Sequence, residues 1–117
     1  IVLPDASGNA GNIFVNTRSF SASSGAAVRA TTFGAGDAGD VTIVSTDLVE
    51  LTESDIATIA DESSGGDAGD ISITTGTYLA SGKQGYLWSG TFNGGRNGGN
   101  ITLTADSVTL LNRSTID

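Results

Sequence analysis

Short runs in which apolar and polar residues alternate recur along the chain, each directly after a glycine-rich segment. This alternation, together with the many β-branched residues, predicts strands that bury one face. Glycine interrupts every stretch that could follow a helical period, so we expect no helix longer than a turn. The first strand of each repeat is predicted at Ile13–Val15, Val41–Ile43, Ile71–Ile73 and Ile101–Leu103.

The glycine-rich segments before these strands are copies of one motif. Gly36–Asp40 reads Gly-Asp-Ala-Gly-Asp and returns unchanged at Gly66–Asp70, and looser copies stand at Gly8–Asn12 and Arg96–Asn100. The polar residue at the end of the motif recurs after 28 to 30 residues. A fixed period of this size indicates a repeat architecture.

Two further apolar columns follow in every repeat, so three short strands per repeat are predicted. Repeats of this kind bury their apolar sides by stacking. We therefore expect an all-β fold, a right-handed parallel β-helix (β-solenoid) with about four coils of 28–30 residues. The second column is Phe20, Leu48, Tyr78 and Val108, and the third is Val28, Ile56, Tyr86 and Ile116.

The register on the second and third sides of the coil has two possible solutions. Either Leu48 points inward, or Val49 and Leu51 do, and a slip of one residue exchanges the two faces of a strand. We favour the second solution, because it leaves the intervening glutamate outside. In Tyr86–Trp88 we favour Leu87 inside, because a narrow coil holds a leucine more easily than two large aromatic rings.

The two ends of the sequence fall at the same point of the coil, inside the third strand. Counting from Ile116 through Asp117 and Ile1 to Asn12 gives 13 steps, between the 12 and 14 found inside the chain. We expect a single module over residues 1–117, with coil repeats starting near 12, 40, 70 and 100 and uncapped ends. Open strand edges invite pairing, so we expect head-to-tail stacking into a filament, with separate subunits or with further units of one tandem chain.

Composition narrows the possible partners. The net charge of −8 argues against nucleic acid and anionic membranes, which require basic patches. No apolar run approaches the ~18 residues of a membrane span, so we expect no membrane insertion. Cysteine and histidine are absent, which removes disulfides and the usual general base. Because the first residue is Ile1, we expect a processed product or an excised piece.

The repeats resemble the filamentous-haemagglutinin-like proteins, which are repetitive exoproteins of Gram-negative bacteria often exported by two-partner secretion. The residues that carry the resemblance are GNAGNIFVNT, GDAGDVTIVSTDLVEL, GDAGDISITT and GGNITLTADSVTLLNRSTI. The glycine-rich, acidic version is most similar to those of cyanobacteria. The resemblance implies a long right-handed β-helix at the cell surface that acts in adhesion or aggregation, and it implies no catalytic residue.

The acidic motif has two interpretations. Glycine-rich aspartate loops bind calcium in some β-rolls, which makes Asp37, Asp40, Asp67 and Asp70 weak calcium candidates. We favour a structural interpretation, in which glycine supplies positive φ and the Asx side chains bond nearby backbone N–H groups and each other. No other cofactor is expected. The structural ladder is predicted at Asn12, Asp40, Asp70 and Asn100, with Asn9, Asp37, Asp67 and Asn97 three residues earlier.

Exposed aromatic residues suggest a second possible site. Tyr86, Trp88 and Phe92 lie close in sequence, with Phe33 at a similar loop position. Aromatic rings beside polar groups stack on sugars, so these residues are weak glycan candidates.

The sequence contains two other surface patterns. Flat threonine arrays are typical of ice-binding β-helices, but Phe14 and Val44 interrupt this array, and ordinary β-propensity explains it better. Some β-helices act on polysaccharides through carboxylates, but without histidine we prefer a solvated acidic edge and expect no enzyme. The array is Thr42, Ser72, Thr102, Thr74 and Thr104, and the carboxylates are Glu50, Glu53, Asp55, Asp61 and Glu62.

The sequence therefore predicts a secreted structural module of an extracellular filament or surface fibre, with a role in adhesion, aggregation or a biofilm matrix. The acidic surface is expected to keep fibres apart at low salt and to permit lateral contacts when salt screens it. The alternative is a glycan-binding or calcium-dependent adhesin module, and a polysaccharide-active enzyme is more remote.

Overall fold

The computed structural model describes residues 1–3, 6–61, 65–92 and 97–117, which contain eight strands and no helix. Four long strands alternate along the chain with four shorter ones. The strands are β1 (Ile13–Ser23), β2 (Ala27–Thr32), β3 (Val41–Thr52), β4 (Asp55–Ala60), β5 (Ile71–Ser81), β6 (Tyr86–Thr91), β7 (Ile101–Leu111) and β8 (Thr115–Ile116).

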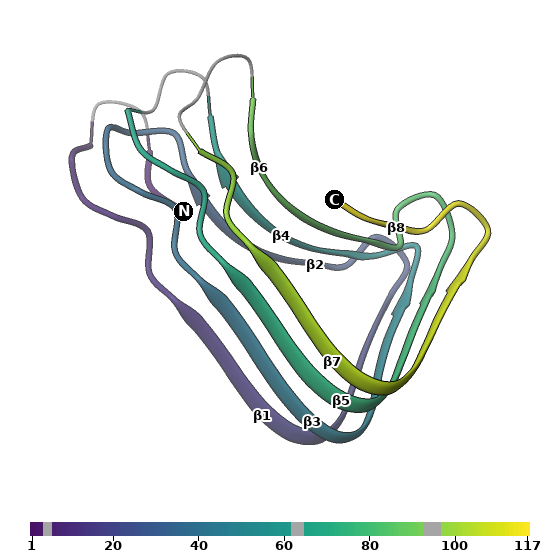
Figure 1. Ribbon diagram of the computed structural model, residues 1–117. Coiled ribbons are helices and arrows are strands. Elements are labelled where there is room, and N and C mark those ends of the chain that lie inside the picture. Colours follow the sequence, from purple (N-terminus) through teal and green to yellow (C-terminus); the bar gives the residue numbers. More distant parts are fainter. Residues whose placement is uncertain (4–5, 62–64, 93–96) are drawn as a thin grey trace.

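The strands form two parallel sheets that run up the same stack. The long strands pair in the order β1-β3-β5-β7 and the short ones in the order β2-β4-β6-β8, and every pair is parallel. Figure 1 shows the chain winding through equivalent paths one above another, as in a β-solenoid of about three turns. The predicted all-β class and parallel stacking are confirmed.

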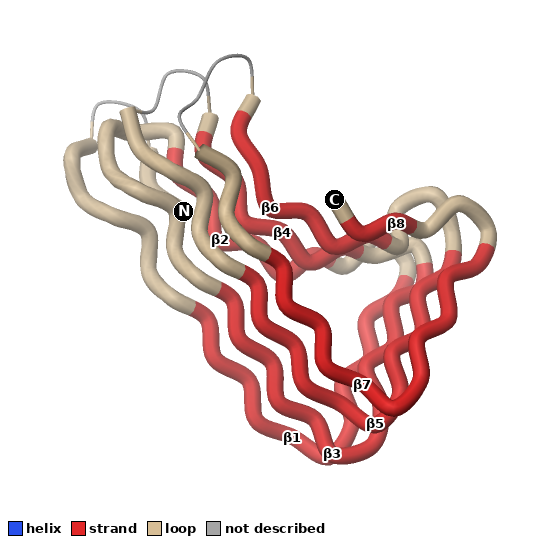
Figure 2. The backbone as a smooth tube through the Cα atoms, in the orientation of Figure 1, coloured by secondary structure: helices blue, strands red, loops and turns tan. Residues whose placement is uncertain are grey.

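Each coil contains two strands, and the prediction of three short ones was wrong in this respect. The first two predicted strands run together as one long strand that bends around a corner, as Figure 2 shows. The ladder loses its register at the bend, between Thr17 and Ser19 in β1. There the Ser45 hydroxyl of the next coil lies 2.8 Å from the carbonyl oxygens of both Arg18 and Leu48, which share its single proton. This buried hydroxyl therefore serves backbone carbonyls at the bend, where the ladder is interrupted.

Strand β3 is one residue longer than its neighbours, which changes the second apolar column. Val49 pairs with both Phe20 and Tyr78, so Leu48 lies outside the column in which we had placed it. Val49 and Leu51 are fully buried while Leu48 is half-buried. The favoured register is thus confirmed, and the assignment of Leu48 to the second apolar column was wrong.

The third apolar column is formed on the short strands. Leu87 pairs with Ile56 and Ile116 and is fully buried, whereas Tyr86 and Trp88 remain partly exposed. Leu87 therefore takes the inward position, as we favoured, and Tyr86 does not belong to the column.

The interior is a narrow core of stacked aliphatic side chains. Ile43, Ile73 and Leu51 are fully buried in the middle coils, where a coil lies on either side. Tyr78 is also fully buried, and its hydroxyl has no hydrogen-bond partner among the described residues. Burial raises the pKa of Tyr78 well above its ordinary range, because the phenolate would have to form in an apolar surrounding.

Candidate functional site

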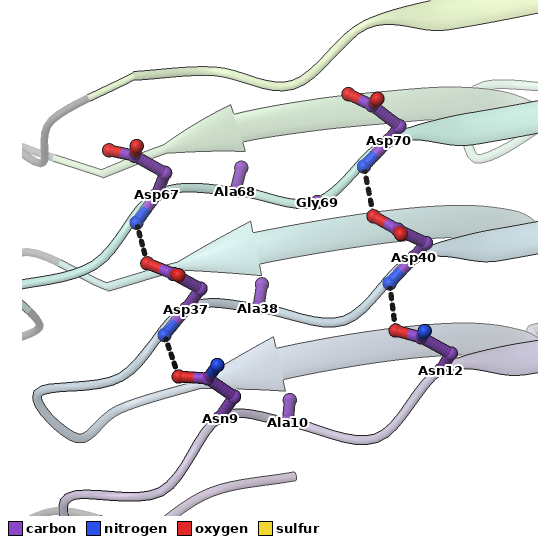
Figure 3. A pocket seen from close by; sticks show the side chains of 10 residues that line it. All are labelled: Asn9, Ala10, Asn12, Asp37, Ala38, Asp40, Asp67, Ala68, Gly69 and Asp70. Atoms are coloured by element: carbon purple, nitrogen blue, oxygen red, sulfur yellow. Dashed lines mark hydrogen bonds between the residues drawn. The ribbon is translucent and has the colours of Figure 1, made fainter.

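Two parallel ladders of Asp and Asn side chains run up the outside of the stack, and both are built from the repeated glycine-rich motif. In each ladder a side-chain oxygen accepts a hydrogen bond from the backbone N–H of the equivalent residue one coil further on (Figure 3). The distances from donor nitrogen to acceptor oxygen are 2.7 to 3.0 Å. The first Asx ladder is Asn9, Asp37, Asp67 and Asn97, and the second Asx ladder is Asn12, Asp40, Asp70 and Asn100.

Each ladder step also contains a backbone hydrogen bond in the opposite direction. The side chain of Asp40 accepts from the N–H of Asp70 at 2.8 Å, and the N–H of Val41 donates to the carbonyl of Asp70 at 2.9 Å. The same pair of bonds joins Asn12 and Ile13 to Asp40. An Asx side chain therefore takes the place of a main-chain carbonyl and continues the sheet hydrogen bonding beyond the end of the strand.

The glycines of the motif serve a different purpose from the one predicted. Positive φ angles occur at Gly25 and Gly82 and not at the motif glycines, so the expectation of left-handed backbone there was wrong. A Cβ atom at Gly39 would instead run into the backbone carbonyl of Gly11, and one at Gly69 into that of Gly39. Glycine is required because successive coils approach too closely for any side chain.

A shallow groove of about 350 Å³ lies between the two ladders, and all four calcium candidates line it (Figure 3). One oxygen of Asp37 and one of Asp40 already accept backbone N–H groups. Across the described residues, no group of three or more Asp or Glu side chains is close enough to hold a metal ion. The ladders are therefore explained by the hydrogen bonds that they make, and calcium binding stays a prediction.

The glycan candidates lie on the outer side of the short strands. Tyr86 and Trp88 project from β6, and the Trp88 ring contacts Phe92 edge-on, with centroids 4.8 Å apart and planes at 62°. A Cβ at Gly90 would meet Trp88 Nε1 at 2.8 Å, so the indole lies along the strand over this glycine. Phe33 follows β2 as Phe92 follows β6, two coils away, so it does not join the cluster.

An ion pair that the sequence reading missed lies beside these aromatic residues. Arg29 donates from Nε and Nη2 to the two carboxylate oxygens of Asp55, at 2.7 and 2.9 Å. The Asp55 side chain is 5% exposed. These hydrogen bonds raise the pKa of the Arg29 guanidinium and outweigh the opposing effect of burial. The register could have revealed the pair, because Arg29 stands beside Ala57 and Asp55 lies two residues earlier on the same face.

Four of the five carboxylate candidates lie in described residues, and they are spread over different parts of one coil. Glu50 lies on β3 near Ser21, with 3.4 Å between Oε1 and the serine Oγ, and Glu53 lies in the following turn with a φ of 49°. Asp55 is held by its arginine, and Asp61 follows the far end of β4, about 20 Å along the strand. Glu62 falls outside the described residues. The acidic-edge interpretation was therefore wrong for Asp55, which is buried.

The outer hydroxyl array has the predicted register. Thr42, Ser72 and Thr102 stack in one column with Phe14 at its end. Val44, Thr74 and Thr104 form the neighbouring column.

Within the described part of the chain, no helix is long and apolar enough to cross a membrane. Comparisons with protein-family models, curated proteins and solved structures found no match for this chain. Its function must therefore be argued from the ladders, the core and the surfaces described above.

Proposed function

We propose that this chain is a structural module of an extracellular filament or surface fibre, in which coils stack head to tail into a continuous β-helix. The observation that carries this proposal is the contrast between the middle and the outer coils. In β3 and β5 the inward residues are buried, whereas in β7 the equivalent residues are exposed or half-exposed. The apolar columns thus continue to the open faces of the stack.

The exposed residues at one open face are large and aliphatic. Val108 pairs with the fully buried Tyr78 but is itself 48% exposed, and Leu110 pairs with buried Ala80 and is 42% exposed. Covering such surface gains roughly 25 cal/mol for each Å² of apolar area removed from water. A further coil in the same register would cover it and would also pair the free edge of β7.

In this proposal the coils are right-handed, as parallel crossovers nearly always are, and the module supplies about four of them, counted from its four long strands. The next coil belongs to a second copy or to a continuation of the same chain. The resemblance of the repeats to filamentous-haemagglutinin-like exoproteins fits the parallel stack, and on that basis we propose that the fibre acts at the cell surface in adhesion, aggregation or a biofilm matrix.

The proposal is tested by imaging the 117-residue chain at increasing concentration in the electron microscope. We expect unbranched fibres with an axial strand spacing of about 4.8 Å and a module repeat of about 19 Å, which is four strand spacings. Compact particles of one size at all concentrations would contradict it. Diffraction from aligned fibres provides the control, because a random aggregate gives no module repeat.

A second candidate function, glycan binding, is supported by the outer side of β6. Trp88 and Phe92 form a partly exposed aromatic pair, and the Arg29–Asp55 pair lies beside Tyr86. Rings of this kind stack on sugar faces while charged groups bind hydroxyls. Titration with acidic and neutral oligosaccharides, followed by fluorescence of the single tryptophan, tests it. A signal that depends on calcium alone would favour the calcium-dependent adhesin instead.

A further inference from the structure

Two glycines in the first coil, Gly8 and Gly11, are not crowded by any described residue. The motif glycines of later coils are needed because a Cβ would strike the coil before them. Gly8 and Gly11 occupy the same motif positions, yet a Cβ at either would meet no described atom within 4 Å, and neither has a positive φ. The close packing that explains Gly36 and Gly39 is therefore absent at Gly8 and Gly11 in the single molecule.

We infer that the open face of the first coil is a docking surface for the fourth coil of a second copy of this chain, in the same register that joins coils within the molecule. This inference rests on the proposed function and specifies its contact. Gly11 would then face the backbone of the partner's Gly99, as Gly39 faces the backbone of Gly11 within the molecule.

The lengths of the outer strands support this register. Strands β1 and β7 both have 11 residues, whereas β3 has 12. A β7 edge can therefore pair with a second copy's β1 from end to end in equivalent positions. Val108 and Leu110 would then be covered by the partner's Phe20 and Ala22, which occupy the same columns.

The polar ladders support it as well. Both ladders read Asn, Asp, Asp, Asn from the first coil to the fourth. At the docking surface the amides of Asn97 and Asn100 would accept the backbone N–H groups of the partner's Asn9 and Asn12. Two neutral amides would meet there, so the contact adds no repulsion between carboxylates. The same bond within the chain, from Asp40 N to Asn12 Oδ1, is 2.9 Å long.

The segments at the two ends of the sequence also fit one stack. Val2 forms a parallel bridge with Thr32, at the end of β2, while Thr115 and Ile116 pair with the beginning of β6. In a stacked pair, Thr115 and Ile116 of one copy and Val2 of the other would lie in the same coil. The first two would stand where a short strand begins, and Val2 where it ends. They therefore complete one strand between them without overlap.

The first experiment compares Gly11→Ala with Gly65→Ala in the whole chain. At Gly65 the nearest atom to a new Cβ is 3.6 Å away, an ordinary contact, so this variant is the matched control. We expect Gly11→Ala to melt like the parent when monomeric but to associate at least tenfold more weakly by sedimentation. Unchanged association would overturn the inference, as would a lowered melting temperature of the monomer, which would give this glycine a function within the chain.

The second experiment measures the register by disulfide trapping, since the chain has no cysteine of its own. Phe14 and Thr102 are in the same outward column, so Phe14→Cys with Thr102→Cys should give a ladder of oligomers on a non-reducing gel. Within one molecule the two positions are three strand spacings apart, about 14 Å, too far for a disulfide. The control pair, Phe14→Cys with Thr104→Cys, places the thiols about 8 Å apart at the contact and should link poorly.

The outcomes separate the two proposals. Fibres with the module repeat but no cross-linking of Phe14→Cys with Thr102→Cys would overturn this register and leave the fibre module standing. Equal cross-linking of both cysteine pairs would also overturn it. Absence of any association would overturn the docking of a second copy and, with it, a fibre assembled from separate subunits.

Discussion

The glycine-rich motif and the corner turn after each long strand both break the regular sheet, but they do so for different physical reasons. The motif repeats almost without change, and its glycines are needed because neighbouring coils nearly touch there. The corner turns occupy residues 24–26, 53–54, 82–85 and 112–114, which share no sequence. All the positive φ angles of the described residues lie in these turns.

Of these two constraints, close approach between coils and positive φ, only the first produces a repeated residue in the sequence. Close approach between backbones admits glycine alone at the second motif glycine, so this glycine returns in every coil, as Gly11, Gly39, Gly69 and Gly99. Positive φ is satisfied by Gly82 in one turn, by Asn112 in another and by Glu53 in a third, at differing cost. In a stacked fold, a glycine that returns in every coil therefore indicates close contact between coils. A turn whose residues differ from coil to coil indicates a constraint on backbone conformation that several residue types can meet.

The largest expected effect is that of Gly69→Ala in the motif. Its Cβ would meet the carbonyl of Gly39, which is backbone and cannot rotate away. We expect a loss of about 3 kcal/mol in the free energy of unfolding, at the upper end of overpacking costs. Urea denaturation of the monomer measures it. Gly11→Ala is the matched control, and an equal loss there would show that crowding between coils is not the cause.

A smaller effect is expected at the corner, where Gly25→Ala tests conformation without crowding. Gly25 has a φ of 82° and nothing within 4 Å of a new Cβ. The left-handed backbone costs a residue other than glycine about 1 kcal/mol, and asparagine less. Thermal melting of Gly25→Ala and Gly25→Asn measures the difference. If alanine proved as stable as glycine here, conformation would not distinguish the corner from the motif.

The smallest effect is expected from the ladder side chains themselves. Asp40→Ala removes the acceptor for the N–H of Asp70, which lies at the surface where water can replace it. We expect a loss of about 0.5 to 1 kcal/mol by urea denaturation. Asp40→Asn keeps an acceptor oxygen and should stay within a few tenths of a kcal/mol of the parent. If Asp40→Asn lost as much as Asp40→Ala, charge and not the hydrogen bond would maintain the ladder.

Much of the core could be predicted because it depends on period and alternation. The parallel stack follows from the repeat. Leu51 was placed inside because that register leaves Glu50 outside, and Leu87 because a narrow coil holds a leucine more easily than two large aromatic rings, and both are buried. The joining of two predicted strands into one could not be read from the sequence. Apolar spacing marks which residues face inward, but it does not show whether the backbone ladder continues around a bend.

The surface was less predictable, because it depends on register between coils. The sequence suggested that Asp55 is a solvated carboxylate. The pairing of β2 with β4 instead places it diagonally opposite Arg29 of the preceding coil, where its side chain is buried. The function of the motif glycines was misread for a related reason. Local turn chemistry suggested positive φ, whereas the constraint comes from atoms 28 to 30 residues away in the chain.

The unequal lengths of the long strands have a consequence for how such a chain can vary. Strand β3 has one residue more than β1, and the turn after it, 53–54, is shorter than the turn at 24–26. These two changes cancel, so the corner leaves the coil length unchanged. The three complete short strands each have six residues, whereas the connections from them to the next long strand, residues 33–40, 61–70 and 92–100, have eight, ten and nine. Differences in coil length therefore arise mainly in these connections, so coils of different length can stack while the pairing of the strands is preserved.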